Sequence, residues 1–148
     1  MYRSVLIVCI GNICRSPMAE ALMRASLEEQ HRPAPVASAG LAALVGAPPE
    51  PVATELMDEL GIDISAHRAR QITVEDLKTH DLILVMDREQ QRQLEKWVTS
   101  LKGRVFRLGH WDDDDIDDPF MAPREAFVEA LDRIRRGVHR WIPYVSGP

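Results

Sequence analysis

The sequence predicts an α/β fold in three layers, with a parallel sheet of about four strands and helices on both faces. Short apolar runs alternate with segments of helical periodicity along the 148 residues, a pattern typical of parallel sheets joined by right-handed helical crossovers. The first apolar run, at residues 4–9, has no polar alternation, as expected of a strand buried on both faces. A loop suited to phosphate binding follows this first strand.

The first strand and helix are predicted at the N-terminal end. The run SVLIVC at residues 4–9 is rich in β-branched side chains, which favours a strand. Ser16 is placed to cap the helix that follows, and Pro17 suits its first turn. The buried face of this helix is indicated by apolar residues at helical spacing: Ala19, Leu22, Met23 and Leu27.

A second strand and further helices are predicted in the middle of the chain. Residues 35–38 indicate a short strand, closed by Gly40. The next helix ends at Gly61. Thr73 and Asp76 have the spacing of a capping box, with Asp in place of Glu. The apolar face of the helix before Gly61 is expected to consist of Val52, Leu56, Met57 and Leu60.

Two more strands and two helices complete the expected alternation. Residues 81–86 (DLILVM) are the clearest strand after the first, and Asp87 is placed to cap a helix over residues 88–98. Residues 103–108 predict a short fourth strand, and the aspartate-rich residues 112–118 must be loop. One face of a long last helix is lined by Phe127, Ala130, Leu131, Ile134, Val138 and Trp141.

Composition excludes several classes of function. Asp and Glu outnumber Lys and Arg by 23 to 18, a net charge of −5, so no nucleic acid partner is expected. No run approaches the ~20 apolar residues of a membrane helix, so no membrane insertion is expected. The first residues are not read as a signal peptide, because cleavage would remove the motif described next. We expect one domain over residues 1–148, cytoplasmic and, since no long apolar seam is left over, monomeric.

The candidate functional site lies in VCIGNICRSPMAEA, residues 8–21. Cys9 and Arg15 are separated by five residues: Ile10, Gly11, Asn12, Ile13 and Cys14. This length can form a ring whose main-chain N–H groups point inward, and Gly11 and Asn12 tolerate the backbone conformations that a ring requires. On the start of a helix such a ring binds an oxyanion, and the guanidinium of Arg15 matches two phosphate oxygens.

Both cysteines of the chain lie in this stretch. The N–H groups favour the thiolate of Cys9, which then acts as a nucleophile, and Ser16 is close enough to donate a hydrogen bond to it. Cys9 as a simple buried residue is the alternative, but the strand, glycine and helix start together favour function. Cys14 is most simply a packing residue of the loop. A reversible disulfide between Cys9 and Cys14, which would protect the nucleophile from irreversible oxidation, stays open.

A phosphoryl group leaving an alkoxide or phenoxide needs a proton donor, which is typically worth ~10²–10⁴-fold in rate. The candidates are the aspartates of residues 112–118, most of which are expected to be solvated charges that repel one another. Asp118 is favoured because Pro119 restricts its backbone and can aim its side chain. Crowded carboxylates also favour the protonated form. Asp117 is the alternative acid.

On these residues the chain resembles the low molecular weight protein tyrosine phosphatases. The resemblance rests on VCIGNICRSPMAEA and DPF (118–120), with SAG (38–40), HRARQI (67–72) and DLILVMD (81–87) between them in the family's order. SAGLAALVG, ARQI and GHWD further resemble the bacterial members that act on tyrosine autokinases of capsule and exopolysaccharide export. The resemblance implies hydrolysis of phosphotyrosine in proteins without cofactor or metal. It also implies a partner, the C-terminal tail of such a membrane kinase.

The resemblance implies a role for each matching residue. Cys9 attacks phosphorus and becomes a phosphocysteine, Arg15 and the loop amides hold the oxygens, and Asp118 protonates the leaving phenol and then activates water. Ser16 stabilises the thiolate. A network that braces the loop is matched by Asn12, Ser38 and His67.

The mouth of the pocket departs from the family pattern. Many relatives carry two aromatic residues after the Asp-Pro pair, where this chain has Phe120 and Met121, and Leu44 replaces an aromatic residue in the loop after the second strand. We expect Ile10 and Leu44 to form an aliphatic wall with Phe120 opposite, which still admits aryl phosphates. The absence of the tyrosines argues against regulation by phosphorylation of this loop.

Two other functions share parts of the pattern. A thiol-dependent arsenate reductase has this fold and loop but needs relay cysteines downstream, and no cysteine follows Cys14. A phosphotyrosine-binding module without catalysis would be expected to lose Cys9 or the loop aspartate, and both are present. His67 also has a simpler interpretation, as a surface histidine after a turn, and Arg70 is interpreted as a solvated charge outside the site.

Overall fold

Four parallel strands form the sheet, in the spatial order β2-β1-β3-β4. The computed structural model describes residues 1–101 and 103–148. Its strands are β1 (Val5–Cys9), β2 (Val36–Gly40), β3 (Leu82–Val85) and β4 (Val105–Arg107). Because all four run in the same direction, their carboxyl ends meet at one edge of the sheet, where open α/β folds bind ligands.

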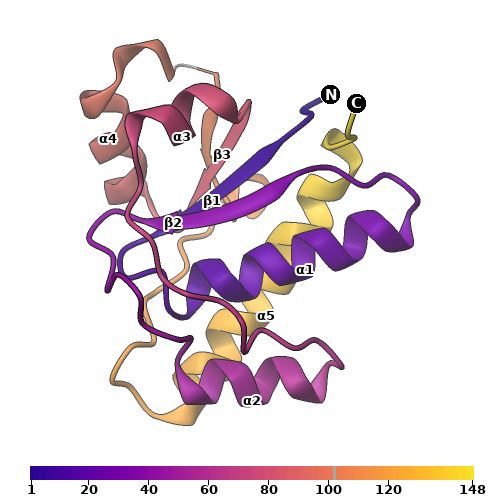
Figure 1. Cartoon of the computed structure of the whole chain (residues 1–148), viewed down its shortest axis with the longest axis vertical. Coiled ribbons are helices and arrows are strands. Elements are labelled where there is room, and N and C mark those ends of the chain that lie inside the picture. Colours follow the sequence, from indigo (N-terminus) through magenta and orange to yellow (C-terminus); the bar gives the residue numbers. More distant parts are fainter. Residues whose placement is uncertain (102) are drawn as a thin grey trace.

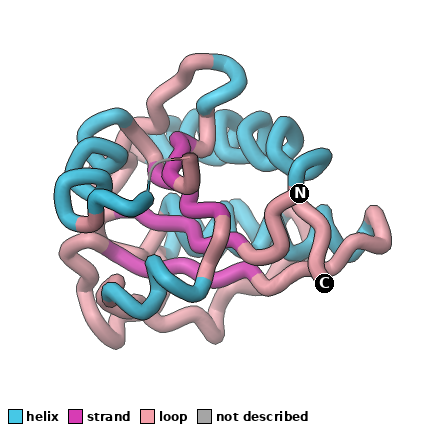
Figure 2. The backbone as a smooth tube through the Cα atoms, turned by 90° about the horizontal axis from the view of Figure 1, so that it is seen from above, coloured by secondary structure: helices cyan, strands magenta, loops and turns pink. Residues whose placement is uncertain are grey.

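Helices cover both faces of this sheet, as Figure 1 shows. One face carries α1 (Arg15–Glu29), α2 (Pro51–Glu59) and α5 (Arg124–Trp141), and the other carries α3 (Val74–Thr79) and α4 (Arg88–Trp97). Seen from above, the strands form the middle of three layers (Figure 2). The predicted fold class is therefore confirmed. Three short 3-10 turns complete the described elements: Thr99–Leu101, His110–Asp112 and Ile142–Tyr144.

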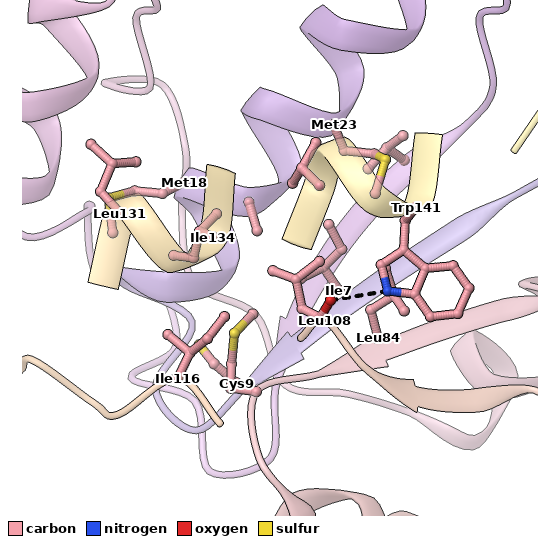
Figure 3. Close-up of a cluster of buried hydrophobic side chains, with 14 of the residues drawn as sticks. Ile7, Cys9, Met18, Met23, Leu84, Leu108, Ile116, Leu131, Ile134 and Trp141 are labelled. Atoms are coloured by element: carbon pink, nitrogen blue, oxygen red, sulfur yellow. Dashed lines mark hydrogen bonds between the residues drawn. The ribbon is translucent and has the colours of Figure 1, made fainter. Parts of the chain in front are cut away.

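Strand β1 is buried at every position, and its side chains alternate between two cores. Leu6 and Val8 join the smaller core under α3 and α4. Cys9 belongs to the larger core, where side chains of α1 and α5 interleave above the sheet (Figure 3). In the same core the indole N–H of Trp141 donates to the carbonyl of Leu108 at 3.0 Å. Cys9 therefore ends a strand that is packed tightly on both sides.

The predicted helix starts are confirmed at two positions and wrong at one. Thr73 and Asp76 form the capping box before α3, and the carboxylate of Asp87 accepts the N–H of Gln90 before α4. Ser16 does not cap α1, which begins at Arg15 without a side-chain cap. Its hydroxyl is engaged inside the phosphate loop instead, as described below. Within the described residues, no helix has the length and apolar character needed to cross a membrane.

Candidate active site

The loop between β1 and α1 turns its carbonyl groups outward. The carbonyls of residues 9, 10 and 11 accept the N–H groups of residues 41, 42 and 44, at 2.9, 3.0 and 3.1 Å, and that of Ile13 accepts the N–H of Glu50 at 2.8 Å. The N–H groups of residues 10–14 make no main-chain hydrogen bond within the part of the chain that the structure describes. These donors remain for a ligand, the arrangement that forms an anion-binding nest.

Gly40 lets β2 approach this loop closely. A Cβ atom at Gly40 would lie 2.4 Å from the carbonyl oxygen of Ile10, a distance that main chain cannot accommodate. The residues after Gly40 can therefore run alongside the loop and donate to its outward carbonyls. The packing of two backbones thus holds the curvature of the loop.

Asn12 is the centre of a buried hydrogen-bond network. It is fully buried and has a left-handed backbone, with φ of 59°, a conformation that Asn tolerates better than most residues. Its amide nitrogen donates to the hydroxyls of Ser16 at 2.7 Å and Ser38 at 3.0 Å. Its amide oxygen accepts the main-chain N–H of Arg70 at 3.0 Å. Every strong hydrogen-bonding group of this side chain is therefore satisfied.

Two further residues extend the network. The hydroxyl of Ser38 donates to a carboxylate oxygen of Glu20 at 2.5 Å. The Nε2 atom of His67 lies 2.7 Å from the carbonyl oxygen of Asn12, and because a carbonyl only accepts, Nε2 must carry the proton. The structure thus brings the predicted brace residues Asn12, Ser38 and His67 together, and His67 is not merely a surface histidine.

The network directs a proton towards Cys9. The Sγ atom of Cys9 lies 2.8 Å from the hydroxyl oxygen of Ser16. That oxygen already accepts the amide of Asn12, so the hydroxyl proton is free to point at the sulfur. A donated hydrogen bond favours the thiolate over the thiol. The position of Ser16, unsuitable for capping, is therefore suited to stabilising a sulfur anion.

Cys14 is buried and unlike Cys9 in its surroundings. Burial, together with the nearby Cys9 and Asp118, raises the pKa of the Cys14 thiol to about 12. Its Sγ atom is 3.7 Å from a carboxylate oxygen of Asp118, to which the thiol can donate. Both cysteines are free, without a disulfide. Cys14 is therefore a neutral thiol near neutral pH, consistent with a packing role.

Arg15 connects the phosphate loop to the loop that follows β4. Its guanidinium is almost fully buried and donates through one Nη atom to the carbonyl of Ile116 at 2.8 Å. The other Nη atom lies 3.5 Å from the carboxylate of Asp118. The Nε atom is buried and has no hydrogen-bond partner within the described residues. Arg15 thus has a fixed orientation and a donor left for a ligand.

Asp118 is the aspartate that the structure brings to the site. Its carboxylate contacts Arg15 and also accepts the main-chain N–H of Phe120 at 3.1 Å. The second contact spans Pro119 and orients the side chain of Asp118. Asp117 does not line the cavity that contains Cys9, whereas Asp118 does. The geometry favours Asp118 over Asp117 as the residue next to a bound phosphate.

The remaining aspartates are exposed or half-buried, as expected, but the expectation that they mainly repel one another is wrong for four of them. The aspartates at 112, 113, 114 and 115 are each paired with an arginine, at 2.5 to 2.9 Å. These arginines come from different parts of the fold: Arg88, Arg107, Arg133 and Arg140. The acid loop, residues 112–118, therefore has most of its charge neutralised and its path held by α4, β4 and α5.

A cavity of about 170 Å³ opens above Cys9. Ile10, Leu44, Phe120 and Asp118 are among the residues that line it, so the predicted wall residues Ile10, Leu44 and Phe120 do line it. Met121 does not: it is 88% exposed, with a φ of 65° that turns the chain away after Phe120. The apolar walls and the donor-lined floor suit a ligand with an aromatic ring and an anionic head.

Three positions contribute that sequence reasoning missed. Glu20 accepts from Ser38, Arg70 contributes its main-chain N–H to Asn12, and Ile116 supplies the carbonyl that holds Arg15. The side chain of Arg70 meanwhile forms a two-point ion pair with Asp76. Arg70 and Ile116 act through main-chain groups, which every residue type offers, so their residue types could not reveal these roles. Of the three, only Ile116 had a signal in the sequence: it is the single apolar residue among six aspartates in DDDDIDD, a pattern that indicates a buried position within the loop.

A four-stranded parallel α/β fold with a cysteine-centred anion loop after its first strand is the architecture of the cysteine-dependent phosphatases, and the lack of any cysteine after Cys14 argues against the arsenate reductases that share it. The chain belongs to the low molecular weight phosphotyrosine protein phosphatase family, whose family pattern matches residues 4–146. It is 48% identical over 145 residues to the probable low molecular weight protein-tyrosine-phosphatase EpsP of Ralstonia nicotianae, covering 98% of this chain and 97% of that protein.

Solved structures show the same relationship. The tyrosine phosphatase AmsI of Erwinia amylovora has a TM-score of 0.89 at 35% identity, covering 97% of this chain and 93% of that one. Wzb of Vibrio vulnificus, solved in complex with benzylphosphonate, has a TM-score of 0.89 at 33% identity, covering 97% and 99%. The chain is therefore a low molecular weight protein tyrosine phosphatase, as the sequence resemblance implied.

Proposed function

We propose that this phosphatase works through a phosphocysteine on Cys9. The thiolate attacks phosphorus while the loop N–H groups and Arg15 hold the three non-bridging oxygens. The S–P bond forms, the bond from phosphorus to the phenolic oxygen breaks, and the proton of Asp118 passes to that oxygen. The single observation that best supports this is the chain of hydrogen bonds from Asn12 through Ser16 to Cys9, which favours a sulfur anion at the floor of the pocket.

The second half of the reaction reverses the proton transfer. Asp118, now a carboxylate, takes a proton from water, whose oxygen attacks phosphorus. The S–P bond breaks, phosphate leaves and the Cys9 thiolate is restored. The contact of Asp118 with Arg15 at 3.5 Å supports both steps, because it places the carboxyl group beside the guanidinium that would hold the phosphoryl group. Asp117 has no comparable position.

The pocket supports an aryl phosphate as substrate. Its cavity is lined by the apolar side chains of Ile10, Leu44 and Phe120 as well as by Cys9 and Arg15, a combination suited to a phenyl ring that carries a phosphate. Benzylphosphonate, bound by the Vibrio vulnificus relative, has an aromatic ring and a phosphonate head. A phosphotyrosine side chain in a protein meets both requirements.

The physiological partner we propose is the tyrosine-phosphorylated C-terminal tail of a cytoplasmic-facing bacterial membrane kinase of polysaccharide export. The support is the similarity to EpsP, AmsI and Wzb, together with the segments SAGLAALVG and GHWD. The test is to compare kcat/KM on such an autophosphorylated kinase from the same organism with that on unrelated phosphotyrosine peptides. A clear preference for the kinase is expected, and equal values would contradict this choice of partner.

The proposed chemistry is tested by a panel of phosphotyrosine, phosphoserine and phosphothreonine peptides of one sequence. Only the phosphotyrosine peptide is expected to be turned over, and EDTA is expected to have no effect. Turnover of all three peptides at similar rates would contradict the aryl pocket. Loss of activity in EDTA would indicate a metal-dependent reaction instead of nucleophilic catalysis by Cys9.

A further inference from the structure

Arg107 is an unusual residue for the end of a sheet strand. It is the last residue of β4, and only 9% of its side chain is exposed. One Nη atom donates to Asp115 at 2.9 Å and the other to Asp113 at 2.5 Å. A buried guanidinium therefore bridges two carboxylates of the acid loop, and its five fixed donors suit this better than a lysine ammonium would.

The segment held in this way leads directly into the active site. Residue 116 follows Asp115, and the N–H of Ile116 donates to the carbonyl of Met86 at 2.9 Å. The carbonyl of Ile116 accepts Arg15, and Asp118 stands two residues further on. Only two residues therefore separate Asp115, which Arg107 holds, from Asp118. So short a segment limits how far Asp118 can move while Asp115 is held.

Other contacts hold the same loop less firmly. Arg88 shares Asp113 but 58% of its side chain is exposed, and Arg133, 30% exposed, contacts Asp114 and the carbonyl of Asp115. Exposed ion pairs are worth little because water and salt screen them. Arg107 is the partner that combines burial, two carboxylates and attachment to the sheet.

A glycine allows the loop to reach Arg107. The loop folds back so closely over Gly109 that a Cβ there would lie 2.3 Å from the carbonyl oxygen of Asp114. Asp113 meanwhile adopts a left-handed backbone, with φ of 48°. The turn is therefore tight, and it brings the carboxylates of Asp113 and Asp115 within hydrogen-bond distance of Arg107.

We infer that Arg107 is a positioning residue for the general acid: by clamping Asp113 and Asp115 to the end of β4, it fixes the path of the loop that delivers Asp118 to the leaving oxygen. The inference rests on the proposed role of Asp118. Arg107 touches neither substrate nor Cys9, so it acts only through the loop. Its loss is expected to weaken protonation of the leaving group and to leave the phosphate loop intact.

The test exploits leaving groups that differ in their need for a proton. Phenyl phosphate requires the acid, whereas 2,4-dinitrophenyl phosphate leaves without one, and kcat/KM on each reports the step that forms phosphocysteine. Arg107→Met keeps the apolar stem and volume but removes both charge-assisted bonds. We expect roughly a 5- to 20-fold loss on phenyl phosphate, below the ~10²–10⁴-fold of a lost acid, and no more than about a 2-fold loss on the dinitrophenyl ester.

Three companion variants keep the result interpretable. Arg107→Lys, which can hold only one carboxylate well, is expected to give a smaller loss. Arg136→Met is the control, because Arg136 forms an exposed ion pair with Asp132, one turn away on α5, and has no other ion pair within the described residues. Turnover of both substrates should be unaffected. If Arg107→Met does not fold, the double variant Asp113→Asn with Asp115→Asn removes both ion pairs of Arg107, together with the exposed Arg88–Asp113 pair, and is expected to show the same selective loss.

Asp118→Asn separates failure of this inference from failure of the proposed function. When Asp118 is already Asn, adding Arg107→Met is expected to cause little further loss on phenyl phosphate relative to the dinitrophenyl ester, because both changes act on one proton transfer. If Asp118→Asn alone loses equally on both substrates, the proposed acid is wrong. If Asp118→Asn is selective but Arg107→Met is unchanged, or loses equally on both esters, then Arg107 has no role in positioning the acid.

Discussion

In the proposed mechanism the phosphate loop and the acid loop act together on one reaction, but they are built in opposite ways. Both follow the carboxyl end of a strand, and each is packed against a glycine, Gly40 or Gly109. The phosphate loop is braced by buried, mostly neutral hydrogen bonds that converge on Asn12. The acid loop is held by Asp–Arg pairs that are partly or largely exposed.

The difference follows from the charge that each loop must handle. A cup for a phosphate dianion must keep its N–H donors free, so its shape is best fixed by carbonyls and side chains that point away from the ligand. The acid loop carries six carboxylates within residues 112–118, and these would repel the same dianion. Pairing four of them with arginines removes most of that repulsion and leaves Asp118 beside Arg15.

Cys9 is the proposed nucleophile, so replacing it is expected to have the largest effect on activity. Cys9→Ser is expected to lower turnover of aryl phosphates by roughly 10⁵-fold or more while phosphate still binds, because the N–H groups and Arg15 remain. Turnover and phosphate affinity are measured on the same preparation. Cys14→Ser is the matched control, and it should keep nearly full activity because Cys14 is a neutral buried thiol. Retained turnover in Cys9→Ser would rule out this nucleophile.

The acid loop is tested by the matched pair Asp118→Asn and Asp117→Asn. The first is expected to lower kcat/KM on phenyl phosphate by ~10²–10⁴-fold and that on 2,4-dinitrophenyl phosphate far less. The second should change both by no more than a small factor, since Asp117 lies outside the cavity above Cys9. A larger selective loss in Asp117→Asn would reverse the assignment of the acid.

The buried network of the phosphate loop is tested at Asn12. Asn12→Gly keeps the left-handed backbone but leaves Ser38, Ser16 and the Arg70 N–H without their partner, at about 1–3 kcal/mol for each buried group left unsatisfied. We expect a lower Tm and weaker phosphate binding. Asn12→Ala adds backbone strain of about 1–2 kcal/mol, since Ala disfavours positive φ. Equal stability of the wild type and Asn12→Gly would mean that the network does not hold the loop.

Salt should affect the two loops differently. Raising ionic strength from about 0.05 M to about 1 M shortens the Debye length to about 3 Å and screens exposed pairs, while buried neutral hydrogen bonds are unaffected. We expect the ratio of kcat/KM on phenyl phosphate to that on 2,4-dinitrophenyl phosphate to fall by about 2- to 5-fold. Because both esters are dianions, screening of substrate attraction cancels. An unchanged ratio would show that the exposed pairs, such as that of Arg88 with Asp113, do not help to position the acid.

Low pH is expected to weaken the ion pairs of the acid loop. Hydrogen bonds from Arg107 and Arg88 hold the pKa of Asp113 below its ordinary 3.8. Since the pKa is lowered in the folded state, the contribution of the pair is complete above the unfolded value and is lost as pH falls through the folded one. From pH 5 to 8 the pairs should therefore persist. Between pH 7 and 8, where both esters are dianions, the salt dependence should be the same.

Sequence reasoning predicted the phosphate loop far better than the acid loop. Asn12, Ser16 and Arg15 act within a few residues of Cys9, so their spacing alone places them at the strand end and the helix start. The arginine partners of Asp113, Asp114 and Asp115 come from α4, β4 and α5, and only the folded path of the loop brings them together. Charge patterns in sequence report signs and spacing but not which distant charges become neighbours.

Detection of the phosphocysteine intermediate tests the proposed role of Cys9 most directly. Cys14→Ser, mixed with 2,4-dinitrophenyl phosphate and quenched in acid within a turnover, should gain the mass of one phosphoryl group, located on Cys9 by fragmentation. Cys9→Ser, treated in the same way, should carry no phosphate on Cys14. A phosphoryl group on Cys14 in place of Cys9, or full turnover without any cysteine-bound phosphate, would contradict the account.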